Sequence, residues 1–227
     1  MASIDTGFGK VVWHEDFLGP AVNTTNDIVV GETGAAGTQT FNAQPNGALR
    51  IVTDVIDDDN GGAGGALIWK ANSGGPLIFE ARVASVTAIT LRAYYVGLTD
   101  TLVSSIEMPF ELATTVLTST ATDAVGFVYD TDATNAYWHC VGVKANVDGI
   151  MVNTGVAPAT AGTYQTLRVV VDSDGNAEFF IDSKYVGSVA NAVTASVAQC
   201  AAFVVESRSA AAKTADIDLF HMESGRV

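Results

Sequence analysis

Hydrophobic and polar residues alternate most clearly over residues 167–189, in the stretch LRVVVDSDGNAEFFIDSKYVGSV. In the runs on either side of Asp174, every second side chain is hydrophobic, which is the period of an extended strand with one buried face. Asp174 and Gly175 suit a turn that needs positive φ, and Asp182 and Ser183 make a second turn. The pattern therefore predicts a three-stranded antiparallel meander.

Comparable runs recur along the chain, rich in Val, Ile, Phe, Tyr and Trp and separated by Gly, Asn, Asp and Ser. This pattern is typical of many short strands joined by turns. Strands are expected at residues 11–17, 48–54, 66–70, 77–86, 91–99, 124–130, 137–144, 165–172, 177–182, 184–189, 201–207 and 215–222. Only residues 104–112 could form a short helix, and the glycine-rich stretches 31–37 and 61–65 are interpreted as loops.

Strands without crossover helices pair antiparallel, and two sheets packed face to face bury their hydrophobic faces. The expected fold class is therefore all-β, an antiparallel β-sandwich. Val11 and Trp13 alternate in phase on the first strand, as do Ile217 and Leu219 on the last. Both ends are therefore expected to lie in sheets and close together.

Composition supports a single folded domain, because 48% of the 227 residues are hydrophobic and only 16% are charged. We expect one domain at residues 11–227, preceded by an N-terminal arm at residues 1–10 that could reach a neighbouring molecule. Cys140 and Cys200 lie in hydrophobic runs and are expected to be two buried thiols rather than a disulfide.

The net charge and the lack of targeting signals limit the kinds of partner that the chain is expected to bind. The formal net charge of -14 argues against nucleic acid, because such binding depends on clustered Lys and Arg. No basic residue lies between Arg92 and Lys144, an interval interpreted as a solvated acidic face, with a docking surface for a basic partner as the alternative. No signal peptide and no run of roughly 20 hydrophobic residues is present, so we expect a soluble chain made in the cytosol with no membrane partner.

Four short motifs and the meander point to a fold family. WHEDFLG begins at Trp13, FEARV at Phe79, VGLTD at Val96 and GFVYDTDA at Gly126. Together they resemble the concanavalin A-like jelly roll of lectins and glucanases, most of all the version found in structural proteins of tailed bacteriophages. The resemblance implies a β-sandwich that serves as a capsid decoration (cement) protein or as part of a tail or fibre.

Catalytic residues are not evident. Glucanases of this fold carry the order Glu-x-Asp-x-x-Glu on one strand, and no such run occurs here. Glu178 and Asp182 come nearest, but along an extended chain they lie about 13 Å apart, which is too wide for a glycosidase pair. His14, His139 and His221 accompany no nucleophile motif. No catalytic residue is assigned, and the chain is expected not to be an enzyme.

Metal sites have three weak candidates. If the terminal strands pair, His14 and His221 would approach each other with Glu15 or Glu223 near, and such a group could hold zinc. The acidic turns DDDNG at residues 57–61 and DTD at 130–132 offer oxygen ligands, but the first lacks the glutamate that completes a calcium loop. Solvated turns are the preferred interpretation, and no metal or cofactor is assigned.

Aromatic side chains could bind sugar or protein. Trp13, Trp69 and Trp138 lie inside strand runs and are expected in the core. Phe180 and Tyr94 are out of phase with their neighbours and are expected to face outward, where they would suit either partner.

These features predict a non-enzymatic virion structural protein. We expect a decoration or cement protein that is assembled in the host cytoplasm and binds the outer surface of a phage capsid, through the major capsid protein or other virion proteins. A homo-oligomer is expected, with a trimer as its form. The alternative is a glycan-binding tail, fibre or head-surface module for host attachment, and a polysaccharide-cleaving enzyme is a third, weaker possibility.

Overall fold

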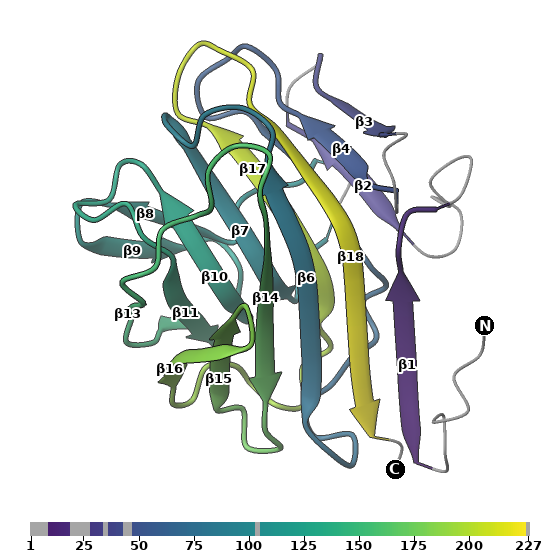
Figure 1. Cartoon of the computed structure of the whole chain (residues 1–227). Coiled ribbons are helices and arrows are strands. Elements are labelled where there is room, and N and C mark those ends of the chain that lie inside the picture. The colour runs from purple at the N-terminus through teal and green to yellow at the C-terminus, as the bar shows by residue number, and fades with distance from the viewer. Residues whose placement is uncertain (1–8, 19–27, 34–35, 43–46, 103–104, 226–227) are drawn as a thin grey trace.

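The computed structural model describes residues 9–18, 28–33, 36–42, 47–102 and 105–225. Within these ranges the chain forms strands and turns without a helix, and neighbouring strands of both sheets pair antiparallel. Two eight-stranded sheets pack face to face, with a two-stranded sheet beside them (Figure 1). The expected all-β antiparallel sandwich is confirmed. No helix in these ranges is long and apolar enough to cross a membrane.

Sheet A has one face in the core and one toward solvent. Burial alternates along its strands, and the predicted meander β14–β15–β16 is confirmed. β1 (Lys10–Glu15) and β4 pair with the same edge of β18. β4 pairs with the first half of β18, and β1 pairs with the second half. The spatial order is β16 (Lys184–Val189), β15 (Ala177–Ile181), β14 (Tyr164–Val171), β6 (Leu77–Ser85), β18 (Thr214–Gly225), β4 (Leu49–Val52) and β3 (Thr38–Phe41).

Sheet B is covered on both faces, because every residue of its central strands β7, β10 and β17 is buried. β13 (Val152–Asn153) pairs with β11 at the edge. The spatial order is β12 (Val147–Asp148), β11 (His139–Lys144), β10 (Ala124–Asp130), β7 (Arg92–Thr99), β17 (Cys200–Ser207), β5 (Asn60–Gly64) and β2 (Val29–Glu32).

The main core lies between the two sheets. Phe79 and Phe220 of sheet A belong to the same cluster as Phe127 and Phe203 of sheet B, and all four are almost fully buried. Burial of each such side chain contributes about 1.5–3 kcal/mol. Cys140 and Cys200 are free and buried, which confirms the expectation of two thiols.

A hydrophobic covering, which we call the roof (residues 105–121), closes the outer face of sheet B. In it, β8 (Phe110–Ala113) and β9 (Val116–Ser119) form a hairpin. Phe110 packs into a second hydrophobic cluster with Tyr95 of the sheet. The helix expected at residues 104–112 is therefore wrong in its described part, because alternate burial along β8 is that of a strand.

Three other expectations about elements also change. Residues 61–65 were expected in a loop, yet most of them belong to β5, where a side chain at Gly62 would collide with the carbonyl oxygen of Phe203. Residues 66–70 contribute only a bridge between Trp69 and Gln199 instead of a strand. Gly31 and Glu32, expected in the other glycine-rich loop, belong to β2, and β3, β9, β12 and β13 were not expected.

The two ends of the described chain lie together, as expected, because β1 pairs with β18. Lys10 is already the first residue of β1, while residues 1–8 of the expected arm lie outside the described residues. A β-bulge in β18 between Ile217 and Leu219 changes the phase of the strand. Phe220 rather than Leu219 therefore enters the core.

Candidate functional site

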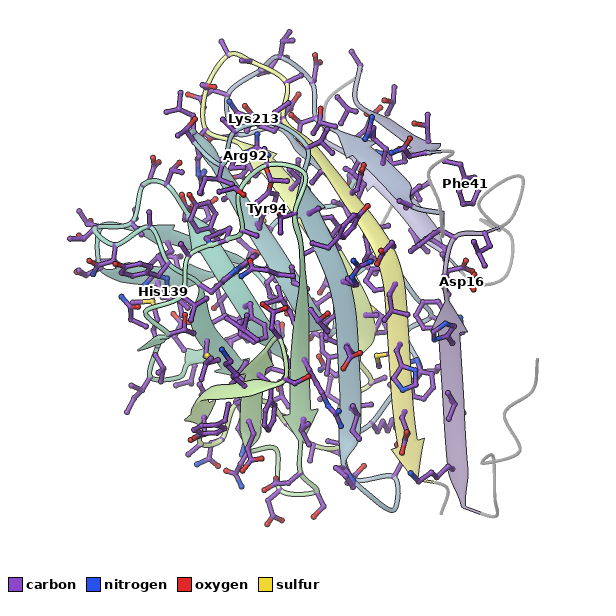
Figure 2. All side chains as sticks on the ribbon, in the orientation of Figure 1. Asp16, Phe41, Arg92, Tyr94, His139 and Lys213 are labelled. Atoms are coloured by element: carbon purple, nitrogen blue, oxygen red, sulfur yellow. The ribbon has the colours of Figure 1, made fainter. Side chains whose placement is uncertain are left out.

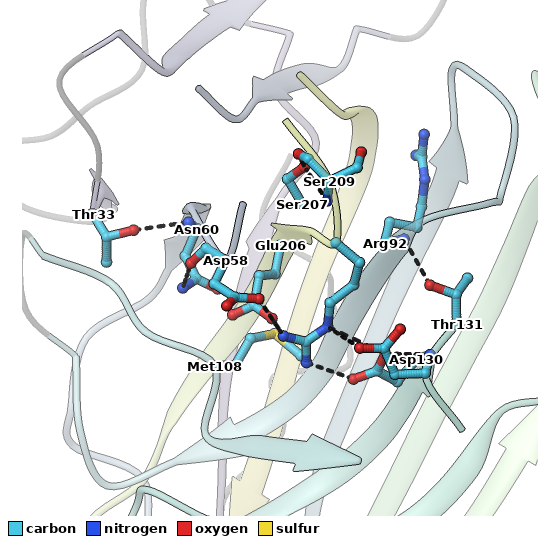
Figure 3. Close-up of polar contacts among 12 residues, drawn as sticks. Thr33, Asp58, Asn60, Arg92, Met108, Asp130, Thr131, Glu206, Ser207 and Ser209 are labelled. Carbon is cyan, nitrogen blue, oxygen red and sulfur yellow. Dashed lines mark hydrogen bonds and ion pairs between the residues drawn. The ribbon is translucent and has the colours of Figure 1, made fainter. Parts of the chain in front are cut away.

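The two acidic turns identified in the sequence meet at one end of sheet B. Asp58 precedes β5 and Asp130 ends β10 (Figure 3). The guanidinium of Arg208 forms ion pairs with both carboxylates. Nη1 of Arg208 donates to Asp58 at 2.9 Å, and Nη2 donates to Asp130 at 2.6 Å. Nη1 also pairs with Glu206. We call these four residues the Arg208 cluster.

Burial dominates the electrostatics of the Arg208 cluster. The side chain of Asp130 is 0% exposed and that of Glu206 is 3% exposed. Burial raises the pKa of Glu206 to about 7, although Arg208 opposes the rise. Burial alone would lower the pKa of Arg208, but its bonds to these carboxylates raise that pKa above the usual value. The cluster is an ion-pair network that ties the loop before β5 to the ends of β10 and β17.

Metal binding gains no support from these turns. Arg208 fills the space between the carboxylates that a calcium ion would need. Among the described residues, no group of three or more His, Cys, Asp or Glu is arranged to hold a metal ion. The role of this cluster is to stabilise the fold, because each of its buried carboxylates already has a cationic partner.

A row of six side chains crosses the outer face of sheet A at a single register. We call it the outer row, and with strands about 4.8 Å apart it extends over roughly 24 Å. It has aromatic rings at one end, a guanidinium and a carboxylate in the middle, and two imidazoles at the other end. Cross-strand pairing sets its order as Tyr185, Phe180, Arg168, Glu80, His221 and His14.

Arg168, in the middle of the outer row, has no hydrogen bond or ion pair within the described ranges, and its Nε atom is also shielded from solvent. The other described arginines are all bonded. Arg92, for example, lies between the sheets near Tyr94 (Figure 2). The bonded set comprises Arg50 with Asp216, Arg82 with Asp218, Arg92 with Ser85 and Tyr94, and Arg208 with its cluster. An unpaired guanidinium can accept an anionic ligand without first breaking an internal bond.

Two shallow depressions follow the outer row and share Glu80 and Arg168. The first, of about 270 Å³, extends to Phe180. The second, of about 250 Å³, extends to His14 and His221. Together they leave the middle of the outer row accessible to a ligand.

The predicted approach of His14 and His221 is confirmed, since they stand opposite each other with ring centroids 5.9 Å apart. Glu223 is near them as expected, with its Oε2 4.0 Å from Nε2 of His221, but both carboxylates that a zinc site would need also have other partners. Glu15 accepts a hydrogen bond from the backbone of Phe17, and Glu223 pairs with Lys10. Burial and the neighbouring His14 lower the pKa of His221, so its imidazole is neutral at pH 7.

The remaining candidates from the sequence lie apart from one another. Glu178 is exposed on β15, and Asp182 follows that strand and accepts a hydrogen bond from the backbone of Thr166, as expected for solvent-facing residues. Trp69 and Trp138 are 5% and 1% exposed and belong to the core, as expected.

The three remaining aromatic predictions have different outcomes. Trp13 packs against the core beside Phe220, with ring centroids 5.9 Å apart, and Phe180 lies on the outer face as expected. The outward position expected for Tyr94 is wrong. Tyr94 faces the main core and Tyr95 faces the roof, because both faces of sheet B are covered.

Comparison with known proteins supports the fold. No family model matches the sequence, and no curated protein matches it. Bacillus licheniformis β-glucanase superposes with a TM-score of 0.60 at 12% identity, over 96% of this chain and 98% of that one. Peanut lectin gives 0.59 at 12% identity, over 96% and 99%. The chain has the concanavalin A-like jelly-roll fold.

A third similar structure carries no assigned activity. It is a Shewanella oneidensis protein of unknown function, with a TM-score of 0.59 at 15% identity, over 96% of this chain and 88% of that one. At such identities the similarity extends to the fold alone, and any function must be argued from the residues of this chain.

The residue that sequence reasoning missed is Arg168. Alternation with Leu167 and Val169 already places it on the solvent face of its strand. Its lack of a partner depends on the residues opposite it on β6 and β15, and only the register of the sheet shows them.

Proposed function

We propose that this chain is a non-enzymatic virion structural protein that decorates the outer surface of a phage capsid. The observation that carries the proposal is a hydrophobic tip on three neighbouring loops. Val55, Ile56 and Leu91 are 59%, 56% and 52% exposed there. Ala210, Ala211 and Ala212 on the β17–β18 loop are exposed beside them. We call these six residues the hydrophobic tip.

Hydrogen bonds hold the loops of the hydrophobic tip side by side. The backbone N–H of Arg208 donates to the carbonyl of Leu91 at 3.0 Å, and that of Asp58 donates to the carbonyl of Ser207 at 2.8 Å. Gathered hydrophobic side chains of this kind mark protein contacts, whereas single exposed ones do not. A tip held in place by the Arg208 cluster loses little conformational freedom when it binds.

The assembly that we propose is a homotrimer on a three-fold position of the shell, with the major capsid protein as partner. A small contact repeated at many equivalent positions provides strong attachment without a deep pocket. A binding role is also supported by the carboxylates. Those of the Arg208 cluster are paired with its guanidinium, and Glu178 and Asp182 are separately exposed, whereas a glycosidase needs two carboxylates that face each other across a bond.

Sedimentation with particles tests this proposal. Particles purified from the host that makes this protein should carry it, and recombinant protein should sediment with particles stripped of it. The variant with Ile56→Asp and Leu91→Asp should stay in the supernatant, because a charge at a hydrophobic contact is costly to bury. The control Val147→Asp changes an equally exposed position on β12, outside the hydrophobic tip, and should sediment as the wild type does.

Heat resistance adds a second measurement. Particles that lack the protein should release their genome at a lower temperature, because a decoration protein stabilises the closed shell by its differential affinity. A protein absent from purified particles, or a tip variant that sediments normally, would contradict the proposal.

The second candidate function is glycan binding for host attachment, and the outer row favours it. The ring of Phe180, a free guanidinium and a carboxylate line a shallow depression, and the ring of Tyr185 packs beside Phe180. An aromatic surface with a few polar groups is the usual composition of a small-ligand site. A glycan array probed with wild type and with Phe180→Ala tests it. Signals that disappear in the variant support this function, and an array without signals rejects it.

A further inference from the structure

The middle of the outer row lacks a hydrogen-bond acceptor. Arg168 is intermediate in exposure, its Nε atom is shielded from solvent, and none of its donors has a partner in the described chain. Glu80 stands directly opposite on β6, yet the two side chains form no ion pair. A planar guanidinium with free donors matches the two oxygens of a carboxylate or a phosphate.

The negative charges around Arg168 favour a carboxylate ligand over a phosphate ligand. Glu80 lies on one side of Arg168, Glu178 is exposed on β15 on the other side, and the whole chain has a formal charge of -14. A phosphate group with nearly two negative charges is repelled more strongly in this field than a carboxylate with one. The favoured ligand therefore carries single, separate carboxylates.

An aromatic surface lies directly beside the guanidinium. Phe180 is the cross-strand neighbour of Arg168, and Tyr185, 58% exposed, packs edge-on against Phe180 with centroids 5.8 Å apart. Adjacent strands are about 4.8 Å apart, so a ring on Phe180 would hold a directly attached carboxylate next to Arg168.

The depression also offers partners for hydroxyl groups. Thr166, Ser183 and Glu80 line it together with Arg168, Phe180 and Val170. Several polar side chains around one aromatic ring suit a polyhydroxylated ring better than the hydrophobic centre of a protein interface.

We infer that the outer row binds a saccharide containing a uronic acid, with the sugar ring on Phe180 and Tyr185 and its carboxylate on Arg168. This inference rests on the second candidate function, glycan binding, and names its ligand class. Thr166, Ser183 and Glu80 bind the ring hydroxyls.

Nuclear magnetic resonance titration of the full chain tests the ligand class. The probes are D-glucuronic acid, D-glucose and acetate, which carry the ring and the carboxylate together or one at a time. Glucuronic acid should shift the amide resonances of β14 and β15 with an affinity at least about tenfold higher than either of the other probes. Equal affinity for glucuronic acid and acetate would overturn the inference, because the ring would then contribute nothing.

Variants locate the two contacts. Arg168→Gln should reduce the affinity for glucuronic acid to that for glucose, while Lys184→Gln removes the same charge from an exposed position of the same sheet and should change it little. Phe180→Ala should lower the affinity for glucuronic acid and leave the affinity for acetate unchanged. Unchanged glucuronic acid binding in Arg168→Gln, with its melting temperature equal to that of wild type, would also overturn the inference.

The array separates this inference from the function on which it rests. Binding of neutral glycans that Phe180→Ala abolishes, without a preference for uronic acids, would overturn the ligand class and leave glycan binding intact. An array without signals, together with no shifts from any probe, would overturn both.

Discussion

The guanidinium of Arg208 is bonded to three carboxylates, whereas that of Arg168 has no partner in the described chain. Arg208 lies at the loop end of sheet B with its side chain 9% exposed, and Arg168 lies on the open face of sheet A. Arg208 directly follows β17, whereas Arg168 lies within β14. The difference indicates that Arg208 stabilises the fold, while Arg168 remains available for a ligand.

The neighbours explain why the two arginines differ. Sheet B brings Asp58, Asp130 and Glu206 to one position, and without a cation the buried carboxylates of Asp130 and Glu206 would repel each other. Sheet A pairs its other outer-face arginines along β18, Arg50 with Asp216 and Arg82 with Asp218. β14 is one strand further from β18, so Arg168 is out of reach of those aspartates.

The largest effect is expected from Arg208→Met, which keeps much of the side-chain volume and removes the charge. It leaves Asp130 and Glu206 buried without their cation, and removing one partner of a buried pair costs about 3–5 kcal/mol. Urea unfolding monitored by tryptophan fluorescence measures the loss. Asp58→Asn, at a side chain 72% exposed, is the control and should cost little. A loss below about 1 kcal/mol in Arg208→Met would show that the cluster is not structural.

The next effect concerns pH. Burial raises the pKa of Glu206 from 4.5 to about 7, so the folded state holds this proton more tightly than the unfolded state. The stability from this group is complete below about pH 4.5 and is lost as pH rises through about 7. The stability of wild type relative to Glu206→Gln should therefore fall by up to about 3 kcal/mol over that interval. Urea unfolding of both proteins across the interval measures this difference, and a constant difference would contradict the raised pKa.

A smaller loss is expected from Arg82→Gln, on the same face as Arg168. Asp218, 8% exposed in the β-bulge, would lose its cationic partner, and burial already raises the pKa of Asp218. Leaving such a group unsatisfied costs about 1–3 kcal/mol. The melting temperature should drop measurably. A melting temperature equal to that of wild type would mean that pairing on this face contributes nothing to stability.

The smallest effect is expected from Arg168→Gln, which breaks no bond in the described chain. The free energy of unfolding should stay within about 0.5 kcal/mol of wild type in the same urea experiment. A loss as large as that of Arg82→Gln would reveal a structural partner for Arg168 and remove the contrast with Arg208.

Alternation in the sequence predicts sheet A well and sheet B poorly, for one physical reason. One face of sheet A is exposed to solvent, so burial alternates along β14 and most of β6, and polar residues such as Arg168 and Glu80 mark the outer face. The roof covers the outer face of sheet B, so β7 is buried throughout and its phase cannot be read, which is why the outward position of Tyr94 was wrong. β5, with the sequence NGGAG, has the composition of a loop, yet its glycines allow close approach to β17.

The candidate sites were predictable only in part. The pairing of His14 with His221 follows from hydrophobic alternation at both ends of the domain. The meeting of the two acidic turns at Arg208, and the isolation of Arg168, depend on which strands are neighbours across long stretches of chain. A single sequence does not specify those pairings.

The position of β18 has a consequence for how the molecule is made. β18 follows every other described strand in the sequence, yet it lies inside sheet A with β6 on one side and β4 and β1 on the other. Lys10 meets Glu223 across 213 residues. As the nascent chain leaves the ribosome, the edges of β1, β4 and β6 that pair with β18 stay unpaired until β18 emerges. Such a high contact order predicts slow folding that finishes late, with a period in which these edges need protection by chaperones from other chains.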